Sequence, residues 1–557
     1  MNYKDEYNQW LDKADLMLSE LKQMSEEEIE DAFYRNLTFG TGGLRGMIGA
    51  GTNRMNEYVV AKASQGLADY VIKHYPKDKR RIAVSYDSRI KSDLFAQVAS
   101  GVFAANEIEV YIYPQLMPTP CLSFAVRELK CAAGIMITAS HNPAKYNGYK
   151  VYGDDGCQIT TEAAKEILAE IDKLDIFSDI NKMTFEDGIS KGSIKYIKDD
   201  VYTAFIENVK KQSVLVNEDI GKDVSIVYSP LNGTGLKPVM RALNESGFTN
   251  ITVVKEQENP DGSFPTCPYP NPEIKEALKL GLKYAKEVNA DLMLATDPDC
   301  DRVGIAVKNK EGEHVLVSGN EVGALLLDYI CDRRIANGTM PEKPVFVKTI
   351  VTTDLGEQIA SHYGVKTINV LTGFKYIGEQ IGLLEKQDRV ADYICGFEES
   401  YGYLTGTYVR DKDAVNGAFM ICEMFAYYKS KGISLLEKLD ELYKTYGYRL
   451  NELRSYQFNG SIGFERMNQI MTDIRDGKFI VNGYKIARKT DYLKDNGDLP
   501  KSNVIKYEFI GGSSVVIRPS GTEPKLKLYS SITAANHSEA NMLNHIIVEA
   551  FESIFEK

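Results

Sequence analysis

Several signals are absent from this 557-residue sequence, and each absence removes a class of protein. No apolar run approaches the length needed to span a bilayer. The N-terminal residues lack the basic and then apolar order of a secretory signal, so we expect a cytoplasmic protein. The eight cysteines include no C-x-x-C pair, which argues against a zinc ribbon or a thioredoxin-like centre and favours free thiols in a reducing compartment.

The charge balance excludes further partners. The chain carries 66 Lys and Arg against 78 Asp and Glu, a formal net charge of −12, and it has no Lys/Arg-rich block. We therefore expect neither nucleic acid nor an anionic membrane as a partner, whereas an anionic small substrate could still meet local positive charge. With 43% apolar and 26% charged residues, the composition predicts a globular enzyme with buried cores, and its length predicts several domains.

Strand-like and helix-like segments alternate along most of the chain. Between Arg81 and Ser140 the order is strand, helix, strand, helix and strand, which predicts βαβ units and a largely parallel sheet. The pattern recurs over residues 223–295 and 321–370. After residue 446 short alternating strands precede a C-terminal helix, which is typical of a separate α+β domain.

These patterns give a fold class and a division of the chain. We expect an α/β protein in which three related α/β domains with mixed sheets precede a C-terminal α+β domain. In the first 38 residues, Ser25 and Glu28 are spaced as a capping box, which predicts two helices joined near Ser25. The predicted units are an N-terminal helical extension (1–38), domain 1 (39–205), domain 2 (206–318), domain 3 (319–445) and domain 4 (446–557).

Ser140 lies at the end of a predicted core strand, in the segment Gly-Ile-Met-Ile-Thr-Ala-Ser-His-Asn-Pro that ends at Pro143. Ligands of open α/β sheets bind outside the carboxyl ends of strands, so Ser140 should face a cleft as a nucleophile. Taken alone, the segment is better explained as an ordinary turn, and only partners elsewhere in the chain favour a nucleophile. Adjacent side chains on extended backbone diverge, so we expect His141 to orient the loop and not to act as the base for Ser140.

Three aspartates follow the predicted strand that ends at Ala295. Alternation along extended backbone would bring Asp297, Asp299 and Asp301 to one point. Such carboxylates repel one another unless a cation compensates, and hard oxygen ligands suit Mg²⁺. An EF-hand is excluded because its glycine and its final glutamate are missing, and a solvated acidic turn is the alternative.

Two further loops offer groups that bind anions and hydroxyls. The segment Arg518–Pro524 lies between predicted strands, and Arg518, Ser520, Gly521 and Thr522 could form an anion-binding nest, although a plain hairpin is the alternative. It does not match the P-loop pattern. The segment Gly396–Tyr403 carries carboxylates and a hydroxyl suited to sugar hydroxyls.

Basic residues stand inside or near these motifs. The glycine-rich stretch from Phe39 to Gly46 does not fit the G-x-G-x-x-G dinucleotide pattern, but its Arg45 could reach an anion. Lys150 follows Ser140 closely enough to return to it, and the segment Arg410–Asp413 adds positive charge that could meet a phosphate or polarise a hydroxyl.

Taken together, the motifs resemble the α-D-phosphohexomutase superfamily, which comprises the phosphoglucomutases and phosphomannomutases. The match covers nearly the whole chain and follows the family order: Gly-Leu-Arg-Gly46, the Ser140 loop, Asp297–Arg302, Glu-Glu-Ser400 and Arg518–Thr522. The resemblance implies four domains around a central cleft. It also implies interconversion of glucose 1-phosphate and glucose 6-phosphate through a bisphosphate intermediate, with glucose 1,6-bisphosphate as activator and a monomer or homodimer as the assembly.

The resemblance also implies residue roles. Ser140 would be the phosphorylated nucleophile, and Mg²⁺ would be held by Asp297, Asp299, Asp301 and a phosphoserine oxygen. Arg45 would neutralise charge on the transferred phosphoryl group, and the Arg518 loop would hold the phosphate that is not reacting. Catalytic roles would also fall to Lys150, His141 and Lys412. Substrate binding would fall to seven residues: Arg302, Thr372, Gly373, Lys375, Glu398, Ser400 and Arg410.

The sugar-binding segments depart from the pattern of many relatives. This chain has Gly-Phe-Glu-Glu-Ser-Tyr-Gly-Tyr403 where many carry Gly-Glu-x-Ser-Gly-His, and Thr372-Gly-Phe-Lys375 where some carry Thr-Gly-His. These features are more similar to the branch of bacterial phosphoglucomutases and related phosphopentomutases. The general base is open between Lys150, Lys412 and Lys375, each of which would need a lowered pKa.

Alternatives within the same chemistry are a phosphopentomutase, a phosphomannomutase and a glucose 1,6-bisphosphate synthase. A sugar-phosphate sensor without turnover would not need both a nucleophile and a metal loop. A metal-dependent phosphatase would not need the second phosphate loop.

Overall fold

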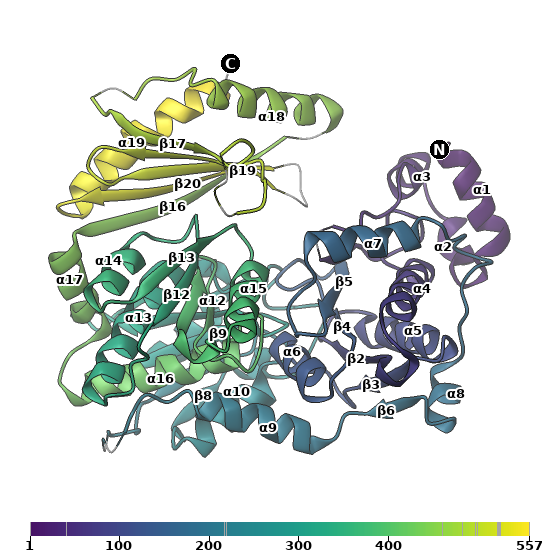
Figure 1. The fold of residues 1–557 in the computed structure, drawn as a ribbon, viewed down its shortest axis with the longest axis horizontal. Helices are drawn as coiled ribbons and strands as arrows, with labels where there is room; N and C mark the ends of the chain where they lie inside the picture. Colours follow the sequence, from purple (N-terminus) through teal and green to yellow (C-terminus); the bar gives the residue numbers. More distant parts are fainter. Residues whose placement is uncertain are drawn as a thin grey trace.

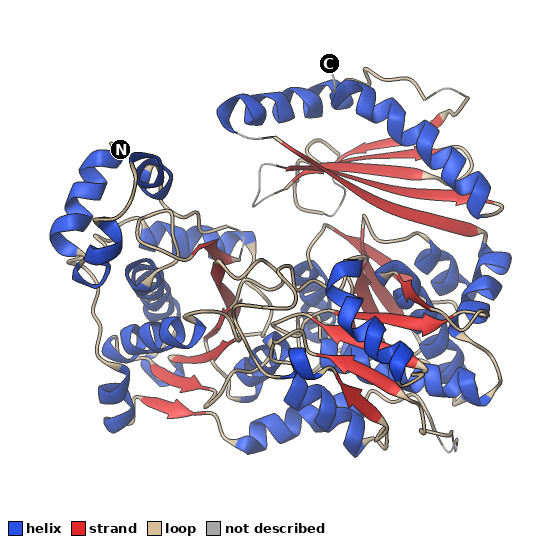
Figure 2. Ribbon diagram, turned by 180° about the vertical axis from the view of Figure 1, so that it is seen from behind, coloured by secondary structure: helices blue, strands red, loops and turns tan. Residues whose placement is uncertain are grey.

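The computed structural model describes residues 2–40, 42–216, 218, 220–458, 460–481, 483–495, 497, 499–520 and 525–555. Within these residues four sheets are flanked by helices, and the N-terminal helices and the C-terminal sheet stand at separate corners of the molecule (Figures 1 and 2). No helix of this part of the chain is long and apolar enough to cross a membrane. The eight cysteines are free and buried.

The first sheet is mixed and carries the Ser140 loop. Its order is β1-β5-β4-β2-β3-β6, with parallel pairing from β4 through β6 and antiparallel pairing of β5 with both β4 and β1. The strands are β1 (Gly43–Met47), β2 (Arg81–Tyr86), β3 (Glu109–Ile112), β4 (Ala133–Ile137), β5 (Tyr146–Gly153) and β6 (Ile194–Tyr196). The helices around it are α4 (Glu57–His74), α5 (Ser92–Ala105), α6 (Thr119–Glu128), α7 (Thr161–Ile171), α8 (Phe185–Ser190) and α9 (Asp199–Lys210).

The N-terminal helices pack on this first unit. They are α1 (Tyr3–Lys13), α2 (Leu18–Leu21) and α3 (Glu26–Phe33), and the predicted capping box of Ser25 and Glu28 is present at the start of α3. Trp10 is fully buried against the rings of Phe33, Tyr58 and Phe177. The extension therefore shares the apolar core of the first sheet.

The second sheet carries the predicted metal loop. Its order is β11-β10-β9-β7-β8, in which β8, β7 and β9 are parallel and β10 returns antiparallel to β9. The strands are β7 (Ile226–Ser229), β8 (Ile251–Val253), β9 (Leu292–Thr296), β10 (Val303–Lys308) and β11 (His314–Val317). Its helices are α10 (Leu236–Glu245), α11 (Lys255–Glu258) and α12 (Lys275–Glu287).

The third sheet carries the predicted sugar loop. Its order is β13-β12-β14-β15, with β15 antiparallel to β14 and the other pairs parallel. The strands are β12 (Val345–Thr349), β13 (Lys366–Val370), β14 (Tyr393–Glu398) and β15 (Gly402–Leu404). The helices of this part are α13 (Gly319–Ala336), α14 (Leu355–His362), α15 (Phe374–Lys386), α16 (Ala414–Ser430) and α17 (Leu435–Tyr446).

The fourth sheet is antiparallel throughout, as predicted for a changed C-terminal unit. Its order is β16-β20-β19-β18-β17, and its helices cover the face turned away from the third sheet (Figure 2). The elements are β16 (Tyr448–Gln457), β17 (Ile486–Asp491), β18 (Ile505–Phe509), β19 (Ser514–Pro519), β20 (Lys525–Ala534), α18 (Gly460–Arg475) and α19 (His537–Phe555).

One topological feature is common to the three α/β sheets. In each, a motif loop joins a strand of the parallel core to an antiparallel return strand: residues 138–145 join β4 to β5, residues 297–302 join β9 to β10, and residues 399–401 join β14 to β15. This equivalence confirms three related α/β units with mixed sheets. The predicted domain boundaries stay a prediction, although each of the ranges predicted for domains 1 to 4 contains one complete sheet.

The sheets are joined by continuous apolar contact. One core cluster extends from α6 through the second sheet into the third sheet and α16. A smaller cluster, which includes Ile350, Leu371, Tyr492 and Tyr529, joins the third sheet to the fourth. These contacts fix how the motif loops of different units lie toward one another.

Candidate active site

Ser140 is held in a conformation that residues other than glycine rarely adopt. Strand β4 ends at Ile137, and Ser140 lies in the following turn with φ of 53°. A left-handed φ costs on the order of 1 kcal/mol, so surrounding contacts must impose it. The backbone N–H donates to Thr138 Oγ1 at 2.8 Å, and the side-chain hydroxyl donates to Asp297 Oδ2 at 3.0 Å.

The expected divergence of Ser140 and His141 is wrong. The left-handed turn at Ser140 replaces the extended backbone on which that expectation rested, and it brings His141 Nδ1 to 3.3 Å from Ser140 Oγ. Burial, assisted by the nearby charges of Arg302 and Arg45, lowers the pKa of His141 well below its usual value. The imidazole is therefore neutral near pH 7, and it contacts the serine hydroxyl directly.

The three predicted aspartates converge, but through a tight turn and not through extended backbone. Ligand oxygens of Asp297, Asp299 and Asp301 lie within 4.8 Å of one another, and all three residues are fully buried. Cys300 adopts φ of 51°, and the N–H groups of Asp301 and Arg302 donate to Asp297 Oδ1 at 3.1 and 3.0 Å. Because the turn folds back onto the Asp297 carboxylate, the three aspartate side chains lie close together.

The carboxylate cluster fits a metal ion. Asp299 Oδ1 and Asp301 Oδ1 are buried without a hydrogen-bond donor among the described residues. Burial and the neighbouring Asp301 and Asp299 raise the pKa of Asp297 well above its ordinary value, which means that the cluster disfavours its own full ionisation. Buried oxygens without donors and mutual repulsion are both relieved by a hard divalent cation.

Two lysines from different units partly neutralise the cluster. Lys150 Nζ on β5 lies 2.8 Å from Asp299 Oδ2, and Lys412 Nζ, from the loop after β15, lies 2.9 Å from Asp301 Oδ2. Burial disfavours both ammonium groups, but the carboxylates outweigh it, so the pKa of each lysine is raised. With all three aspartates ionised, the two lysines leave the cluster with one excess negative charge.

Thr119 is a contact of this cluster that the sequence analysis missed. It begins α6, and both its N–H and its hydroxyl donate at 2.9 Å to Asp299, the first to the carbonyl and the second to Oδ2. The residue follows a proline-rich turn after β3, and that turn was the available signal. Thr119 therefore helps to fix the rotamer of Asp299 within the cluster.

Arg45 and Arg302 add positive charge beside the serine loop. Arg45 lies on β1 opposite Gly148, and its guanidinium donates to Asn142 Oδ1 at 3.2 Å. The glycine at position 43 of the glycine-rich segment is required by the backbone. Gly43 has φ of 142°, and a Cβ there would lie 1.8 Å from the Tyr149 carbonyl oxygen. Arg302 pairs with Glu273. Both arginines act electrostatically on His141, which places them at the nucleophile loop.

The sugar loop brings Glu398 and Glu399 to the ends of β14 and β15. Glu398 is 5% exposed, and its Oε1 accepts from the Gly373 N–H at 3.1 Å, which joins the two predicted sugar-binding segments. Burial raises the pKa of Glu398 to about 7, with Lys412 acting against the shift. Ser400 lies partly exposed in the connecting turn, and Thr372 Oγ1 is buried without a hydrogen-bond partner among the described residues.

Lys375 differs from the other two base candidates. It lies in the first turn of α15, and its carbonyl accepts from Cys157 Sγ at 3.2 Å. Burial lowers the pKa of Lys375, whereas the pKa of Lys150 and of Lys412 is raised. Lys375 is therefore the candidate whose shift favours a neutral amine.

Arg410 is directed away from the carboxylate cluster. Its guanidinium is fully buried, pairs with Glu385 of α15 at 2.9 Å, and donates to the carbonyl groups of Thr407 and Val409. Its backbone N–H donates to Ser123 Oγ at 2.9 Å. These contacts hold the loop that carries Lys412, so Arg410 is placed to support a site residue.

The predicted phosphate loop starts at the end of β19. Arg518 and Ser520 are described, while Gly521 and Thr522 lie outside the described residues. Arg518 hydrogen-bonds with Tyr529 and acts electrostatically on Glu399 of the sugar loop. The third and fourth sheets therefore bring the sugar loop and the start of the phosphate loop to the same region.

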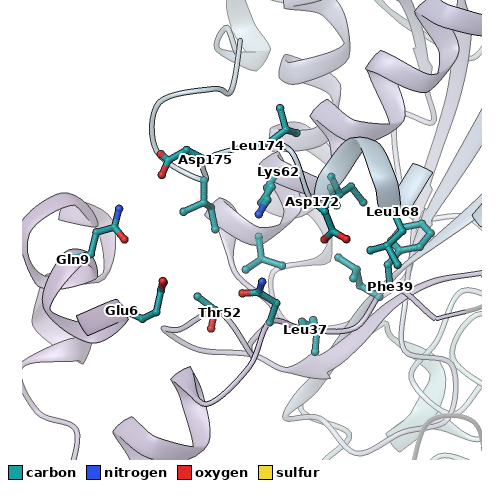
Figure 3. Close-up of a pocket in the computed structure, with 16 residues that line it drawn as sticks. Glu6, Gln9, Leu37, Phe39, Thr52, Lys62, Leu168, Asp172, Leu174 and Asp175 are labelled. Carbon is teal, nitrogen blue, oxygen red and sulfur yellow. The ribbon is translucent and has the colours of Figure 1, made fainter. Parts of the chain in front are cut away.

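A separate cavity of about 160 Å³ lies between the N-terminal extension and α7 (Figure 3). Glu6 of α1, Leu37, Lys62 of α4 and Asp172 are among its lining residues, whereas Ser140 and the three clustered aspartates are not. It is distinct from the carboxylate cluster, and it is a consequence of how the extension packs on the first unit.

Comparison with known proteins supports one family. The family models for phosphoglucomutase/phosphomannomutase alpha/beta/alpha domains I, II and III match residues 36–176, 201–312 and 318–446. A phosphoglucomutase of Staphylococcus epidermidis is 35% identical, covering 94% of this chain and 96% of its own length. A phosphoglucomutase of Staphylococcus aureus strain USA300 is 35% identical, with 97% and 98% covered.

Solved structures show the same fold. A phosphoglucomutase/phosphomannomutase family protein from Burkholderia thailandensis has a TM-score of 0.68 at 15% identity, covering 93% of this chain and 97% of its own. The open form of pp63/parafusin, a phosphoglucomutase from Paramecium, has a TM-score of 0.67 at 20% identity, with 94% and 95% covered. The three domain models and the full-length relatives together show that the chain belongs to the phosphoglucomutase/phosphomannomutase family.

Proposed function

We propose that this enzyme interconverts glucose 1-phosphate and glucose 6-phosphate through a phosphorylated Ser140. The observation that carries the proposal is the contact between Ser140 Oγ and Asp297 Oδ2, at 3.0 Å, inside a carboxylate cluster that fits a cation. A hydroxyl placed there can carry a phosphoryl group whose charge the site offsets. The choice of glucose rests on full-length relatives named phosphoglucomutase.

The proposed reaction has two phosphoryl transfers. The phosphoserine P–O bond breaks as the free hydroxyl of the sugar monophosphate attacks phosphorus and gives its proton to a base, which leaves a bisphosphate and the Ser140 oxygen. The bisphosphate reorients, and its other phosphate returns to Ser140 by the reverse steps. Glucose 1,6-bisphosphate is thus both intermediate and activator.

Mg²⁺ is the proposed ion, held by Asp297, Asp299, Asp301 and a phosphoserine oxygen, where it would offset charge on the transferred phosphoryl group. Arg45 and Arg302 add positive charge at the same loop. Lys150 and Lys412 hold Asp299 and Asp301 in place, and the neutral His141 ring orients the serine hydroxyl. These preorganised charges lower the barrier because they are arranged before the reaction occurs.

Orientation of the sugar is proposed for the third and fourth units. Glu398 would accept hydrogen bonds from the ring hydroxyls, and Ser400 would exchange hydrogen bonds with them. Thr372 and Gly373 would lie beside these contacts. Arg518 and Ser520 would hold the distal phosphate. Lys375 is the proposed general base, because its lowered pKa favours the neutral amine that accepts a proton.

The test is isomerisation of glucose 1-phosphate with a trace of glucose 1,6-bisphosphate, in wild type, Ser140→Ala and the control Ser64→Ala. Ser64 is a buried hydroxyl that contacts Tyr149 at 3.1 Å, away from the loop. We expect activity to be lost only in Ser140→Ala, and full activity of that variant would refute the proposal. Ribose 1-phosphate and mannose 1-phosphate are compared by kcat/KM, and a preference for either would indicate a phosphopentomutase or phosphomannomutase.

A further inference from the structure

Arg89, which no motif singled out, encloses the backbone of the nucleophile loop. It follows β2 in the loop before α5, and its side chain is fully buried. Nη2 donates to the carbonyl groups of Ser140 and Asn142. Nη1 donates to the carbonyl groups of Pro143 and Tyr146, at 3.0 and 3.1 Å. All four terminal N–H groups of the guanidinium therefore serve one short stretch of backbone.

This arrangement requires a guanidinium. Four carbonyl oxygens that face one buried point repel one another, and each would be costly without a donor. Arginine offers five donors in a rigid planar fork, whereas lysine offers three on a single atom and cannot span four acceptors. The contact with the Ser140 carbonyl also helps to impose the left-handed φ of 53° on the residue that carries the nucleophile.

Arg89 is itself fixed from two sides. Asp87 lies on the same loop, with Oδ2 3.3 Å from Arg89 Nε, and its Oδ1 accepts from the Arg89 N–H at 3.0 Å. The Phe264 ring, from the second unit, stacks with its centroid 5.1 Å from the guanidinium carbon. Gly262 forms a bridge with Arg89, and a Cβ there would lie 2.4 Å from the Ile90 nitrogen. The two backbones can approach this closely because position 262 is glycine.

The segment that covers Arg89 leads to the metal loop. Asn232 joins the two: its Nδ2 donates to the Asn259 carbonyl at 2.8 Å, and its own carbonyl accepts from the Asp261 N–H at 3.0 Å. Two residues further on, the N–H and hydroxyl of Thr234 donate at 2.8 and 2.9 Å to the carbonyl of Pro298, which lies between two of the clustered aspartates. Short polar contacts thus run from Arg89 to the carboxylate cluster.

We infer that Arg89 is a positioning residue for phosphoryl transfer. It holds the Ser140 loop in its reactive conformation, and through the segment from Asn259 to Phe264 it fixes the position of that loop relative to the metal loop. The inference rests on the proposed mutase function and deepens it. Arg89 itself does not contact the substrate in this role. Its effect should fall on the transfer step and not on sugar binding, because the sugar-binding residues belong to the third unit.

The test compares Arg89→Lys with Arg80→Lys. Arg80 is the matched control, since it also donates to backbone carbonyls of the first unit, those of Tyr75 and Ile72 at 3.0 and 3.1 Å, away from the Ser140 loop. For each variant we measure kcat and KM for glucose 1-phosphate, Tm, and amide hydrogen exchange of residues 138–147. Misplacement of reacting groups should lower kcat of Arg89→Lys by about 10-fold to 100-fold, with KM within about threefold of wild type.

Faster exchange of residues 138–147 in Arg89→Lys, but not in Arg80→Lys, completes the expected result. The inference is overturned if Arg89→Lys is folded with kcat and exchange like wild type, or if Arg80→Lys shows the same loss of kcat. Should Arg89→Lys not fold, Phe264→Leu is measured instead, and unchanged kcat and exchange in that folded variant overturn the inference. If wild type does not isomerise any sugar phosphate, the proposed function fails, and the exchange comparison still decides the role of Arg89.

Discussion

Lys412 Nζ lies 2.9 Å from Asp301 Oδ2, so the loop after β15 neutralises a carboxylate in the loop after β9. The aspartate side chain is fully buried and the lysine is 12% exposed. Neighbouring Asp299 is balanced in the same way by Lys150 of the first unit. The carboxylate cluster is therefore a meeting point of three units of the chain.

Removing the Lys412 charge should destabilise the protein. Lys412→Met leaves Asp301 without its nearest cation, and breaking a buried ion pair costs about 3 to 5 kcal/mol of unfolding free energy. Lys310→Met is the control, because Lys310 pairs with Glu437 at 3.9 Å on the surface and such pairs contribute about 1 kcal/mol or less. Urea unfolding measures both values. Equal losses would contradict a buried, compensating role for Lys412.

Asp299→Asn should abolish most activity and the response to metal. The substitution keeps the shape but removes a carboxylate ligand, and we expect kcat to fall on the order of 100-fold to 1000-fold. Chelation should inactivate wild type, and Mg²⁺ should restore activity and raise Tm, because it binds the folded state. Asp291→Asn, at the other end of β9, is the control and should keep the Mg²⁺ response. A Tm rise of equal size in Asp299→Asn would contradict the assigned ligand.

Much of this site could be predicted from local sequence. A buried apolar run followed by turn residues correctly placed Ser140 and the Asp297–Asp301 cluster beyond strand ends, whereas Glu398 is the last residue of its strand. The reason is that strand burial and turn chemistry are both local properties. The backbone geometry was less predictable, since the left-handed φ of Ser140 is supported by contacts with Arg89 and Asp297, which are far away in the sequence.

Residues that act through long-range packing were missed for the same reason. Arg89 lies in an ordinary loop, and only the folded chain shows that its guanidinium serves four carbonyl groups. Thr119 likewise needs Asp299, which follows it far along the chain. Periodicity and motif spacing do not report contacts between separate units, so neither role had a strong local signal.

Glu398→Gln should change how stability depends on pH. The pKa of Glu398 is raised from an unfolded value near 4.5 to about 7, mainly by burial. Its contribution is therefore fully present below pH 4.5 and is lost as pH rises through 7, at a cost of about 3 kcal/mol. Gln does not titrate, so the variant should lose less unfolding free energy than wild type between pH 5 and pH 8.

Chemical denaturation at both pH values measures this difference, with the exposed Glu441→Gln as control. The same group should affect catalysis, since the ionised carboxylate accepts hydrogen bonds from sugar hydroxyls. In wild type kcat/KM should rise with pH through about 7, and the step should be missing in Glu398→Gln. Identical pH dependence of stability in the two proteins would argue against a buried, titrating Glu398.

Lys375→Arg should stop proton transfer while keeping a cation. Burial lowers the pKa of Lys375, so the neutral fraction of the amine, and with it kcat, should rise with pH in wild type. A guanidinium cannot serve as a base, and loss of general-base catalysis costs about 100-fold to 10,000-fold in kcat. Lys386→Arg, at the end of the same helix, should remain active. A fully active Lys375→Arg would return the role to Lys150 or Lys412.

Arg518→Ala should weaken the hold on the phosphate that is not reacting. A hydrogen bond to a charged group contributes about 1.5 to 3 kcal/mol, so KM for glucose 1-phosphate should rise about 10-fold to 100-fold. The bisphosphate must reorient while bound, and a weaker hold should release it into solution, where ³¹P NMR can detect it. Arg488→Ala, an exposed arginine of the same sheet, is the control. If Arg518→Ala releases no more bisphosphate than Arg488→Ala and keeps the wild-type KM, the distal phosphate is held by other residues.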